Sequence, residues 1–310
     1  MPMTDNLVTA APTTSLLGGL IRETRPKQWA KNVLVFAAPG AAGQLFHMVT
    51  FRQAVATFVI FCMASAATYL INDIVDVEAD RLHPTKRNRP IAAGVVPVPV
   101  AAISAAILLA GSLALALRRT PALLVVVGMY VILTTTYSMW FKHRPVLDLV
   151  ALSSGFVLRL LGGGYGTGIK ISDWFLVISC FGSLFIATGK REAELRELGP
   201  DAGAIRPTLA VYSDRYLAFL KSLSAGAVLI AYCLWAVERG DRDADAKVWV
   251  LLSIVPFVVA ILRYALLVEL GKGSAPEEII LGDRELQIVG LIWVGLVALS
   301  VYLGQGGHVG

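Results

Sequence analysis

Charged side chains are scarce in this sequence. Asp, Glu, Lys and Arg make up 16% of its 310 residues, whereas hydrophobic residues make up 56%. A soluble domain has about 25% charged and about 45–50% apolar residues, so the composition excludes an ordinary soluble protein. A disordered chain is excluded as well, because disorder requires low hydrophobicity.

Cysteine and histidine are also few. Cys62, Cys180 and Cys233 are isolated within apolar stretches, the four histidines are scattered, and no CxxC or other metal-ligand spacing is present. The sequence therefore indicates neither a zinc site nor a disulfide framework. We interpret the three cysteines as packing thiols.

Long apolar segments, by contrast, are abundant in the sequence. A helix that crosses a membrane needs about 20 mostly apolar residues. We therefore predict an all-α integral membrane protein with about nine transmembrane helices. The predicted spans are 33–49, 53–72, 92–116, 122–141, 146–165, 173–189, 217–237, 247–268 and 286–304.

No polar linker long enough to separate two domains interrupts these spans. We therefore expect a single membrane domain over residues 1–310. It comprises a flexible N-terminus at 1–20, a basic interfacial segment at 21–32 and a nine-helix bundle at 33–304.

The distribution of Lys and Arg predicts the orientation. With the N-terminus inside, 19 of the 27 basic residues fall in inside segments, seven in outside segments, and Arg159 within a span. Cytoplasmic loops of membrane proteins carry such an excess of Lys and Arg. We expect a multi-pass protein of the inner (plasma) membrane with a cytoplasmic N-terminus and active site. The same rule explains the net charge of +5, so we expect no nucleic-acid partner.

The second predicted span ends in an acidic run, NDIVDVEAD, at residues 72–80. If the helix continues, Asn72, Asp73, Asp76 and Asp80 share an arc of about 100°. Like charges so close together destabilise a helix, and a membrane boundary adds a desolvation cost. Oxygen ligands without His or Cys favour Mg²⁺, which commonly combines one or two carboxylates with substrate phosphates. The alternative is a solvated helix end with incidental acids.

Four cations follow the acidic run directly: Arg81, Lys86, Arg87 and Arg89. Cations beside an acidic metal site are what a phosphate-bearing substrate requires. A positive-inside loop would explain these cations equally well, although it would not explain the adjacent acids.

Several segments resemble one protein family. NDIVDVEAD is similar to the first Asp-rich motif, N-D-x-x-D-x-x-x-D, of the UbiA-type membrane prenyltransferase superfamily. Within that superfamily, the chain resembles the decaprenyl-phosphate phosphoribosyltransferase branch. The segments that carry this narrower resemblance are RPKQWAKNVLVFAAP (25–39), ADRLHPTKRNRPIAAG (79–94), DLVALSSGFVLRLLGGG (148–164), GKREAEL (189–195) and RYALLVELGKGSAPEEIILGDRELQ (263–287).

The resemblance implies a UbiA-type helical bundle with active-site loops on the cytoplasmic side, and it implies a reaction. The donor would be 5-phosphoribosyl 1-diphosphate, the acceptor decaprenyl phosphate or a similar polyprenyl phosphate, and Mg²⁺ the cofactor. The product would feed cell-wall arabinan (arabinogalactan) synthesis. Asp73, Asp76 and Asp80 would be the catalytic metal ligands, with Asn72 supporting them.

Further residues would contact the donor. We expect Lys86, Arg87 and Arg89 to bind its phosphates, and Tyr69, four residues before Asp73, to stack on or bond to the same site. An interfacial aromatic residue is the alternative for Tyr69.

The acceptor must be drawn in from the membrane surface. Its phosphate head would be attracted by Arg22, Lys27 and Lys31, although simple interfacial anchoring explains these cations equally well.

The segment after the sixth span departs from the prenylating relatives. Those relatives carry a second Asp-rich motif, D-x-x-x-D, whereas GKREAEL has no Asp pair. Lys190 and Arg191 are second candidates for phosphate contact, and Glu194 is a candidate metal or ribose-hydroxyl partner. The added positive charge suits a donor with a 5-phosphate besides its diphosphate.

Two other functions remain open. One is a UbiA-type prenyltransferase that moves an isoprenoid from its diphosphate to an aromatic or other acceptor. The other is a lipid-phosphate transporter, for which broken helices in repeated positions are typical. Arg159 has either a functional role or a buried polar partner, since Asp148 lies about 16 Å away along the helix. The oligomeric state is open, with a homo-oligomer among the alternatives.

Overall fold

The computed structural model describes residues 15–199, 203, 206–242, 244–272 and 276–303. Throughout these ranges the regular elements are helices, and no strand occurs. Residues 1–14 of the expected flexible N-terminus lie outside the described residues, whereas Leu16 already begins the first helix.

The elements follow one another with short connections. In chain order they are α1 (Leu16–Glu23), η1 (Pro26–Phe36), α2 (Ala37–Ala41), α3 (Met48–Val75), α4 (Val77–Leu82), η2 (Lys86–Asn88), α5 (Val98–Arg119), α6 (Pro121–Met139), η3 (Phe141–His143), α7 (Leu147–Thr167), α8 (Asp173–Leu198), η5 (Pro207–Ala210), α10 (Asp214–Arg242), α11 (Ala244–Leu252), α12 (Ile254–Glu269), α13 (Pro276–Gly282) and α14 (Arg284–Leu303).

Eight helical spans in the described part of the chain are long and apolar enough to cross a membrane. They are α3, α5, α6, α7, α8, α10, α14 and the pair α11–α12, which is counted as one span over Ala244–Glu269. The pair is interrupted at Ser253, three residues before Pro256, whose ring lacks a backbone N–H donor. These spans correspond to the predicted spans from 53–72 onward, so the all-helical membrane bundle is confirmed.

The first predicted span, 33–49, has a different structure. Its residues continue the 3₁₀ helix η1, form the five-residue α2 and then turn before α3. Pro39 cannot donate a backbone hydrogen bond, and Gly43 adopts the left-handed backbone with φ of 71°. The composition of a spanning segment is therefore present, but its helix is short and irregular.

Helix α7 lies at the centre of the bundle. It contacts α3, α6, α8, η1 and α2, and 61% of its most apolar window is buried. A Cβ atom on Gly163 would lie 2.0 Å from the Val35 carbonyl oxygen, and one on Gly166 would lie 2.1 Å from Thr57 Oγ1. Glycine therefore lets η1 and α3 approach the α7 backbone closely, as small residues do in membrane helix packing.

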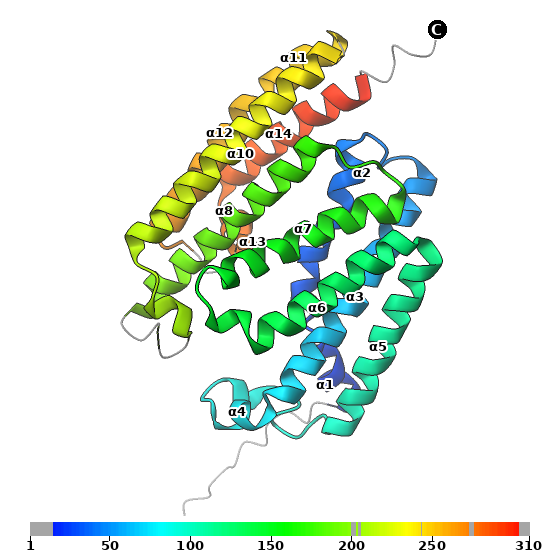
Figure 1. The fold of residues 1–310 in the computed structure, drawn as a ribbon, viewed down its shortest axis with the longest axis vertical. Helices are drawn as coiled ribbons and strands as arrows, with labels where there is room; N and C mark the ends of the chain where they lie inside the picture. Colours follow the sequence, from blue (N-terminus) through cyan, green and yellow to red (C-terminus); the bar gives the residue numbers. More distant parts are fainter. Residues whose placement is uncertain (1–14, 200–202, 204–205, 243, 273–275, 304–310) are drawn as a thin grey trace, which may run out of the picture.

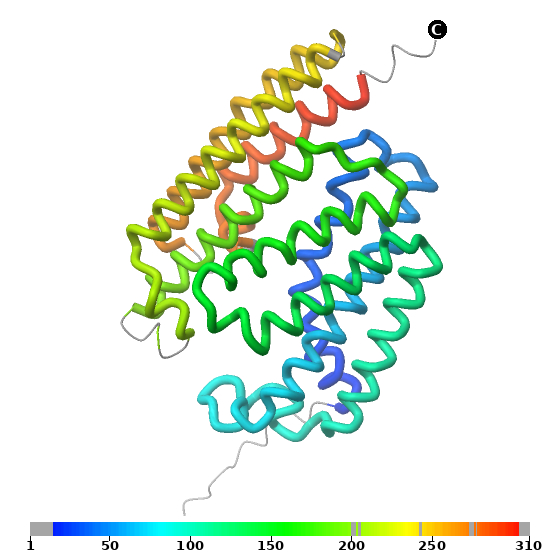
Figure 2. Tube along the Cα trace, in the orientation of Figure 1, coloured from blue at the N-terminus to red at the C-terminus, as the bar shows by residue number. Residues whose placement is uncertain are grey.

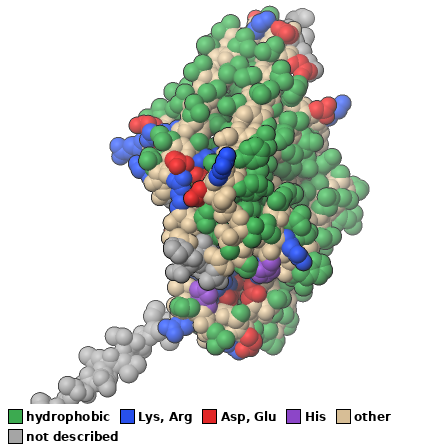
Figure 3. Space-filling view, turned by 60° about the vertical axis from the view of Figure 1, so that its left-hand side comes forward, with side chains coloured by type: hydrophobic (Ala, Val, Ile, Leu, Met, Phe, Trp, Pro, Cys, Tyr) green, Lys and Arg blue, Asp and Glu red, His purple; other side chains and the backbone are tan. Residues whose placement is uncertain are grey.

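The loops predicted to face the cytoplasm meet at the same end of the bundle. The connections after α3, α6, α8 and α12 lie at the lower and left side of Figures 1 and 2. A space-filling view shows charged side chains gathered in groups, with broad hydrophobic surface between them (Figure 3). The loops that carry most of the functional residues expected from the sequence therefore share one end of the bundle.

The close approach at Gly163 predicts a stability effect. Replacing Gly163 with Ala inserts a methyl group against the Val35 backbone and should destabilise the bundle by about 1–3 kcal/mol, the usual range for overpacking. Thermal unfolding in detergent should show a lower Tm. Gly128→Ala is the matched control, because nothing lies within 4 Å of its added Cβ. Equal Tm values for the two variants would contradict the packing account.

Candidate functional site

The acidic run begins inside the last turn of α3 and ends in α4. Asp76 caps both helices, so the two segments bend there rather than forming one straight helix. Asp73 and Asp80 are buried, with 2% and 3% of their surfaces exposed, and Asp76 is partly exposed. Glu78 is exposed and pairs with Arg81 at 2.8 Å. Glu78 is therefore separate from the two buried aspartates.

Arg89 connects the two buried aspartates. Its Nη1 donates to Asp73 Oδ1 at 2.9 Å and to Asp80 Oδ2 at 2.6 Å. Lys86 Nζ lies 3.9 Å from Asp80 Oδ1. Two of the cations predicted to bind phosphate therefore neutralise the acidic run, whereas Arg87 is exposed on η2.

Arg25 is a site residue that sequence reasoning did not select. Its Nη2 donates to both Asp73 oxygens, at 2.6 and 2.7 Å, and its guanidinium lies 4.8 Å from the centre of the Tyr69 ring. Its φ of 51° is uncommon for a residue other than glycine, and such backbone strain often occurs at functional sites. The signals in the sequence were its place in the basic interfacial segment and in the resembling segment 25–39, and neither reveals a partner 48 residues away.

Glu23 links two segments near Asp73. This buried carboxylate accepts a hydrogen bond from the Ile91 backbone N–H at 2.7 Å, which joins the end of α1 to the loop after Arg89. Burial raises the pKa of Glu23 to about 7, and the neighbouring Asp73 carboxyl adds to the rise. Asp73 therefore lies among a second carboxyl group and two arginines.

The first cluster comprises Asp73, Asp76 and Asp80 with Arg25, Lys86 and Arg89, and its Asp76 approaches the loop between α6 and α7. Asp76 Oδ2 lies 4.0 Å from Lys142 Nζ, which belongs to η3. Asn72 is partly buried beside Asp73 in the sequence. Helix η3 also contacts η5, so η3 lies between the acidic run and the loop after α8.

A second charged cluster lies where α6 and α8 end and α7 begins. Arg191 and Asp148 form a fully buried ion pair with Nε 2.8 Å from Oδ2. Arg191 also donates through Nη1 to Glu194 at 2.6 Å and through Nη2 to the Tyr137 hydroxyl at 2.9 Å. Arg191, which the sequence offers as a candidate for phosphate contact, is thus buried among protein partners. Arg191 is 0% exposed, and all three guanidinium nitrogens are hydrogen-bonded within the protein.

The exposed edge of this cluster carries two further cations. Lys190 Nζ lies 3.8 Å from Glu194 Oε1, and Arg206 Nε lies 3.4 Å from Glu194 Oε2. Arg206 also donates to the Tyr137 hydroxyl at 2.9 Å. Both cations are partly exposed, as is Glu194. Arg206 and Tyr137 were not foreseen, because neither belongs to the segments that carried the resemblance.

The other candidates lie at the surface or within the bundle. Arg22 and Lys27 are exposed, and Lys31 donates to Gln28 at 2.6 Å. Arg159 is buried and donates to Asn32 at 2.7 Å, to the Gly155 carbonyl at 2.7 Å and to the Tyr130 hydroxyl at 2.9 Å. The alternative of a buried polar partner therefore holds for Arg159.

The donor set of the first cluster suits a divalent cation shared with a ligand. Within the described residues no group of three or more His, Cys, Asp or Glu side chains is assembled to bind a metal alone. Asp73 and Asp80 nevertheless each present an oxygen to one guanidinium nitrogen, a position that a cation can occupy. Mg²⁺ commonly needs only one or two carboxylates when phosphates and water complete its octahedron.

Comparisons with known proteins identify relatives of this chain. Residues 33–280 match the model of the UbiA prenyltransferase family. The decaprenyl-phosphate phosphoribosyltransferase of Corynebacterium glutamicum is 46% identical, over 94% of this chain and 89% of that one. The enzyme of the same name from Mycobacterium tuberculosis is 44% identical, over 97% of this chain and all of that one.

Solved structures agree on the fold. A UbiA homologue from Archaeoglobus fulgidus, bound to GPP and Mg²⁺, superimposes with a TM-score of 0.66 over 93% of this chain and 99% of that one, at 20% identity. The fold and the charged clusters together define a multi-pass, membrane-embedded helical protein. The chain belongs to the UbiA prenyltransferase family, as its Asp-rich motif predicts.

The buried pair of Arg191 and Asp148 predicts a large stability effect. Replacing Arg191 with Met leaves Asp148 buried without its cation, which typically costs about 3–5 kcal/mol. Unfolding by denaturant in detergent should show this loss. Arg81→Met is the control, because its partner Glu78 is exposed and surface pairs contribute little. If the two variants were destabilised alike, the structural role of Arg191 would be refuted.

Proposed function

We propose that this protein transfers 5-phosphoribose from 5-phosphoribosyl 1-diphosphate to decaprenyl phosphate or a similar polyprenyl phosphate, with release of diphosphate. The observation that carries this proposal is the bridge from Asp73 through Arg89 to Asp80, with Arg25 and Lys86 around it. One site thus combines carboxylates that can bind a metal ion with several cations that can bind phosphate. The names of relatives 43–46% identical support the same reaction.

The first cluster would bind the donor. Asp73, Asp76 and Asp80 would hold Mg²⁺, which neutralises the diphosphate leaving group when it is bound. Arg25, Arg89 and Lys86 pair with these carboxylates in the structure and lie ready to exchange them for donor phosphates.

Three further residues would complete the donor site. Asn72 would support the aspartates, the Tyr69 ring would keep Arg25 in place, and the exposed Arg87 would add a phosphate contact.

The reaction needs stabilisation of charge more than a strong base. The C1–oxygen bond to diphosphate breaks, positive charge develops on C1 and the ribose ring oxygen, and an acceptor phosphate oxygen forms the new bond. A phosphate monoester is already anionic near pH 7, with a second pKa near 6. The protein's own contribution is therefore to orient both anions and to exclude water.

The second cluster would act at the other side of the reacting centre. Lys190 would contact a phosphate, and Glu194 would bind a ribose hydroxyl or the metal. Arg191 would fix Glu194 through its 2.6 Å bond without touching substrate.

We further propose that the protein is a single membrane domain of the plasma membrane, with its N-terminus and both clusters in the cytoplasm. The exposed Arg22 and Lys27, together with Lys31, would attract anionic lipid headgroups, including the acceptor, to that surface. The product would serve cell-wall arabinan synthesis.

The deciding experiment is turnover with purified protein in lipid and Mg²⁺. Diphosphate should be released from 5-phosphoribosyl 1-diphosphate only when polyprenyl phosphate is present. Asp73→Asn and Asp76→Asn should lower this turnover by orders of magnitude, because they remove charge that acts in the transition state. Glu78→Gln is the matched control within the same acidic run and should be near wild type, since Glu78 is exposed and faces away.

Two outcomes would overturn the assignment. Turnover of a prenyl diphosphate, with none of the phosphoribosyl donor, would establish the prenyltransferase alternative that the family match favours. Near-normal turnover in both aspartate variants, with an unchanged Tm, would remove the metal role.

Orientation has its own test. In a background with Cys180 and Cys233 replaced by serine, Thr85→Cys should react with an impermeant thiol reagent only from the cytoplasmic side. Lys170→Cys, exposed in a loop at the opposite end of the bundle, should react only from outside. The reverse pattern would invert the proposed topology.

A further inference from the structure

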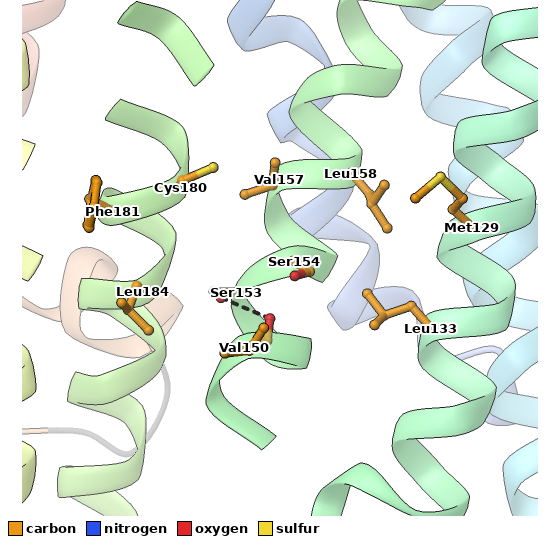
Figure 4. Close-up of a pocket in the computed structure, with 10 residues that line it drawn as sticks. All are labelled: Met129, Leu133, Val150, Ser153, Ser154, Val157, Leu158, Cys180, Phe181 and Leu184. Carbon is orange, nitrogen blue, oxygen red and sulfur yellow. Dashed lines mark hydrogen bonds between the residues drawn. The ribbon is translucent and has the colours of Figure 1, made fainter. Parts of the chain in front are cut away.

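A groove outside the two charged clusters runs along the surface of the bundle between α6, α7 and α8 (Figure 4). Its volume is about 470 Å³, within the range of about 300–1,000 Å³ found for small-molecule pockets. Met129 and Leu133 line it from α6, Val150 and Val157 from α7, and Cys180 and Leu184 from α8.

The lining is apolar and open to the surface that the bilayer covers. Met129, Val150 and Cys180 are exposed. The Ser153 hydroxyl donates to the Val150 carbonyl of its own helix at 3.0 Å, so it presents little polarity to the groove. From Val150 to Leu158 the floor extends over about 12 Å of helix. A ligand suited to this groove is a hydrocarbon chain that arrives from the membrane.

One end of the groove leads to the second charged cluster. Tyr137 lies one turn beyond Leu133 on the same face of α6, and Arg191 lies two turns beyond Leu184 on the same face of α8. Asp148 is two residues before Val150 on α7. On α6 and α8 the apolar lining is therefore followed on the same face by Tyr137 and Arg191, and the ion pair of Arg191 with Asp148 joins α7 to the same end.

The charged end favours an anion. Arg191, Lys190 and Arg206 contribute three cations there, against the two carboxylates Asp148 and Glu194. Arg191 is enclosed, but Lys190 and Arg206 are partly exposed. An apolar groove that ends at exposed cations matches a lipid with a phosphate head, and not a neutral lipid.

We propose that this groove binds the first isoprene units of the polyprenyl phosphate acceptor, with the phosphate directed toward Lys190 and Arg206. This inference rests on the proposed function and specifies where its acceptor enters. The head would lie near the donor, because η3 contacts η5 and carries Lys142, 4.0 Å from Asp76. Since the groove is short, the remainder of the tail stays in the bilayer. Arg22 and Lys27 are then interfacial anchors rather than ligands of the reacting phosphate.

The test combines photocrosslinking with kinetics on the full chain in lipid. A polyprenyl phosphate with a diazirine on its second isoprene unit should label peptides of α7 and α8 around Val157 and Cys180. Val157→Trp fills the groove, so it should reduce this labelling and raise the acceptor KM about tenfold through lost apolar contact. The KM for the phosphoribosyl donor should not change.

Two controls separate the groove from general effects. Ile132→Trp adds the same bulk on the exposed surface of α6 outside the groove lining, and it should behave as wild type. Dimethylallyl phosphate, whose single isoprene unit is too short to reach Val157, should keep the same KM in the Val157→Trp protein.

The outcomes distinguish this inference from the proposed function. Turnover with crosslinks confined to α1, η1 or α14 would refute the groove as the acceptor site but support the proposed function. Crosslinks around Val157 without turnover of the phosphoribosyl donor would support the groove as a lipid site but refute the proposed function. Equal acceptor KM values for Val157→Trp and Ile132→Trp would overturn the groove assignment.

Discussion

The burial of Asp73 at the end of a membrane-spanning helix is the constraint on which the first cluster depends. A buried carboxylate without a partner is strongly destabilising, so cations must be brought to it from elsewhere in the chain. Arg25 reaches it from an uncommon left-handed backbone, and Arg89 reaches it from the loop after α4. The bond between Glu23 and Ile91 then joins those two segments. One charge thus determines the arrangement of α1, the start of η1 and the loop that follows α4.

The second cluster also contains a buried carboxylate, but there the carboxylate and its cation are both buried. Asp148 and Arg191 are enclosed completely, and their partners leave no side of the guanidinium for a ligand. The first cluster is enclosed only in part, because Arg25, Arg89 and Lys86 keep exposed surface. A ligand phosphate can therefore compete for the cations of the first cluster, whereas the buried pair of the second cluster gives Glu194 and Tyr137 fixed positions.

Particular segments show what a sequence can and cannot predict. The helices from α3 onward were predictable, because bilayer thickness sets how long an apolar run must be. The segment 33–49 has the right composition but becomes η1 and α2, because proline and glycine limit its helix. Arg191 was named as a candidate for phosphate contact, because residue type alone does not show whether an arginine is buried or exposed. Its partner Asp148 lies 43 residues away, and only helix packing brings the two together.

The sequence by itself determined the membrane bundle, the end of the bundle at which charge accumulates, and the acidic run with its following cations. These are local patterns of hydropathy, charge and spacing, and they need no knowledge of distant contacts. Only the tertiary structure decided that Arg25 and Arg89 share Asp73, that Arg191 is buried against Asp148, and that an apolar groove lies between α6, α7 and α8. Each of these depends on how α3, α6, α7 and α8 pack, because the cost of burying a charge is set by the partners that packing places beside it.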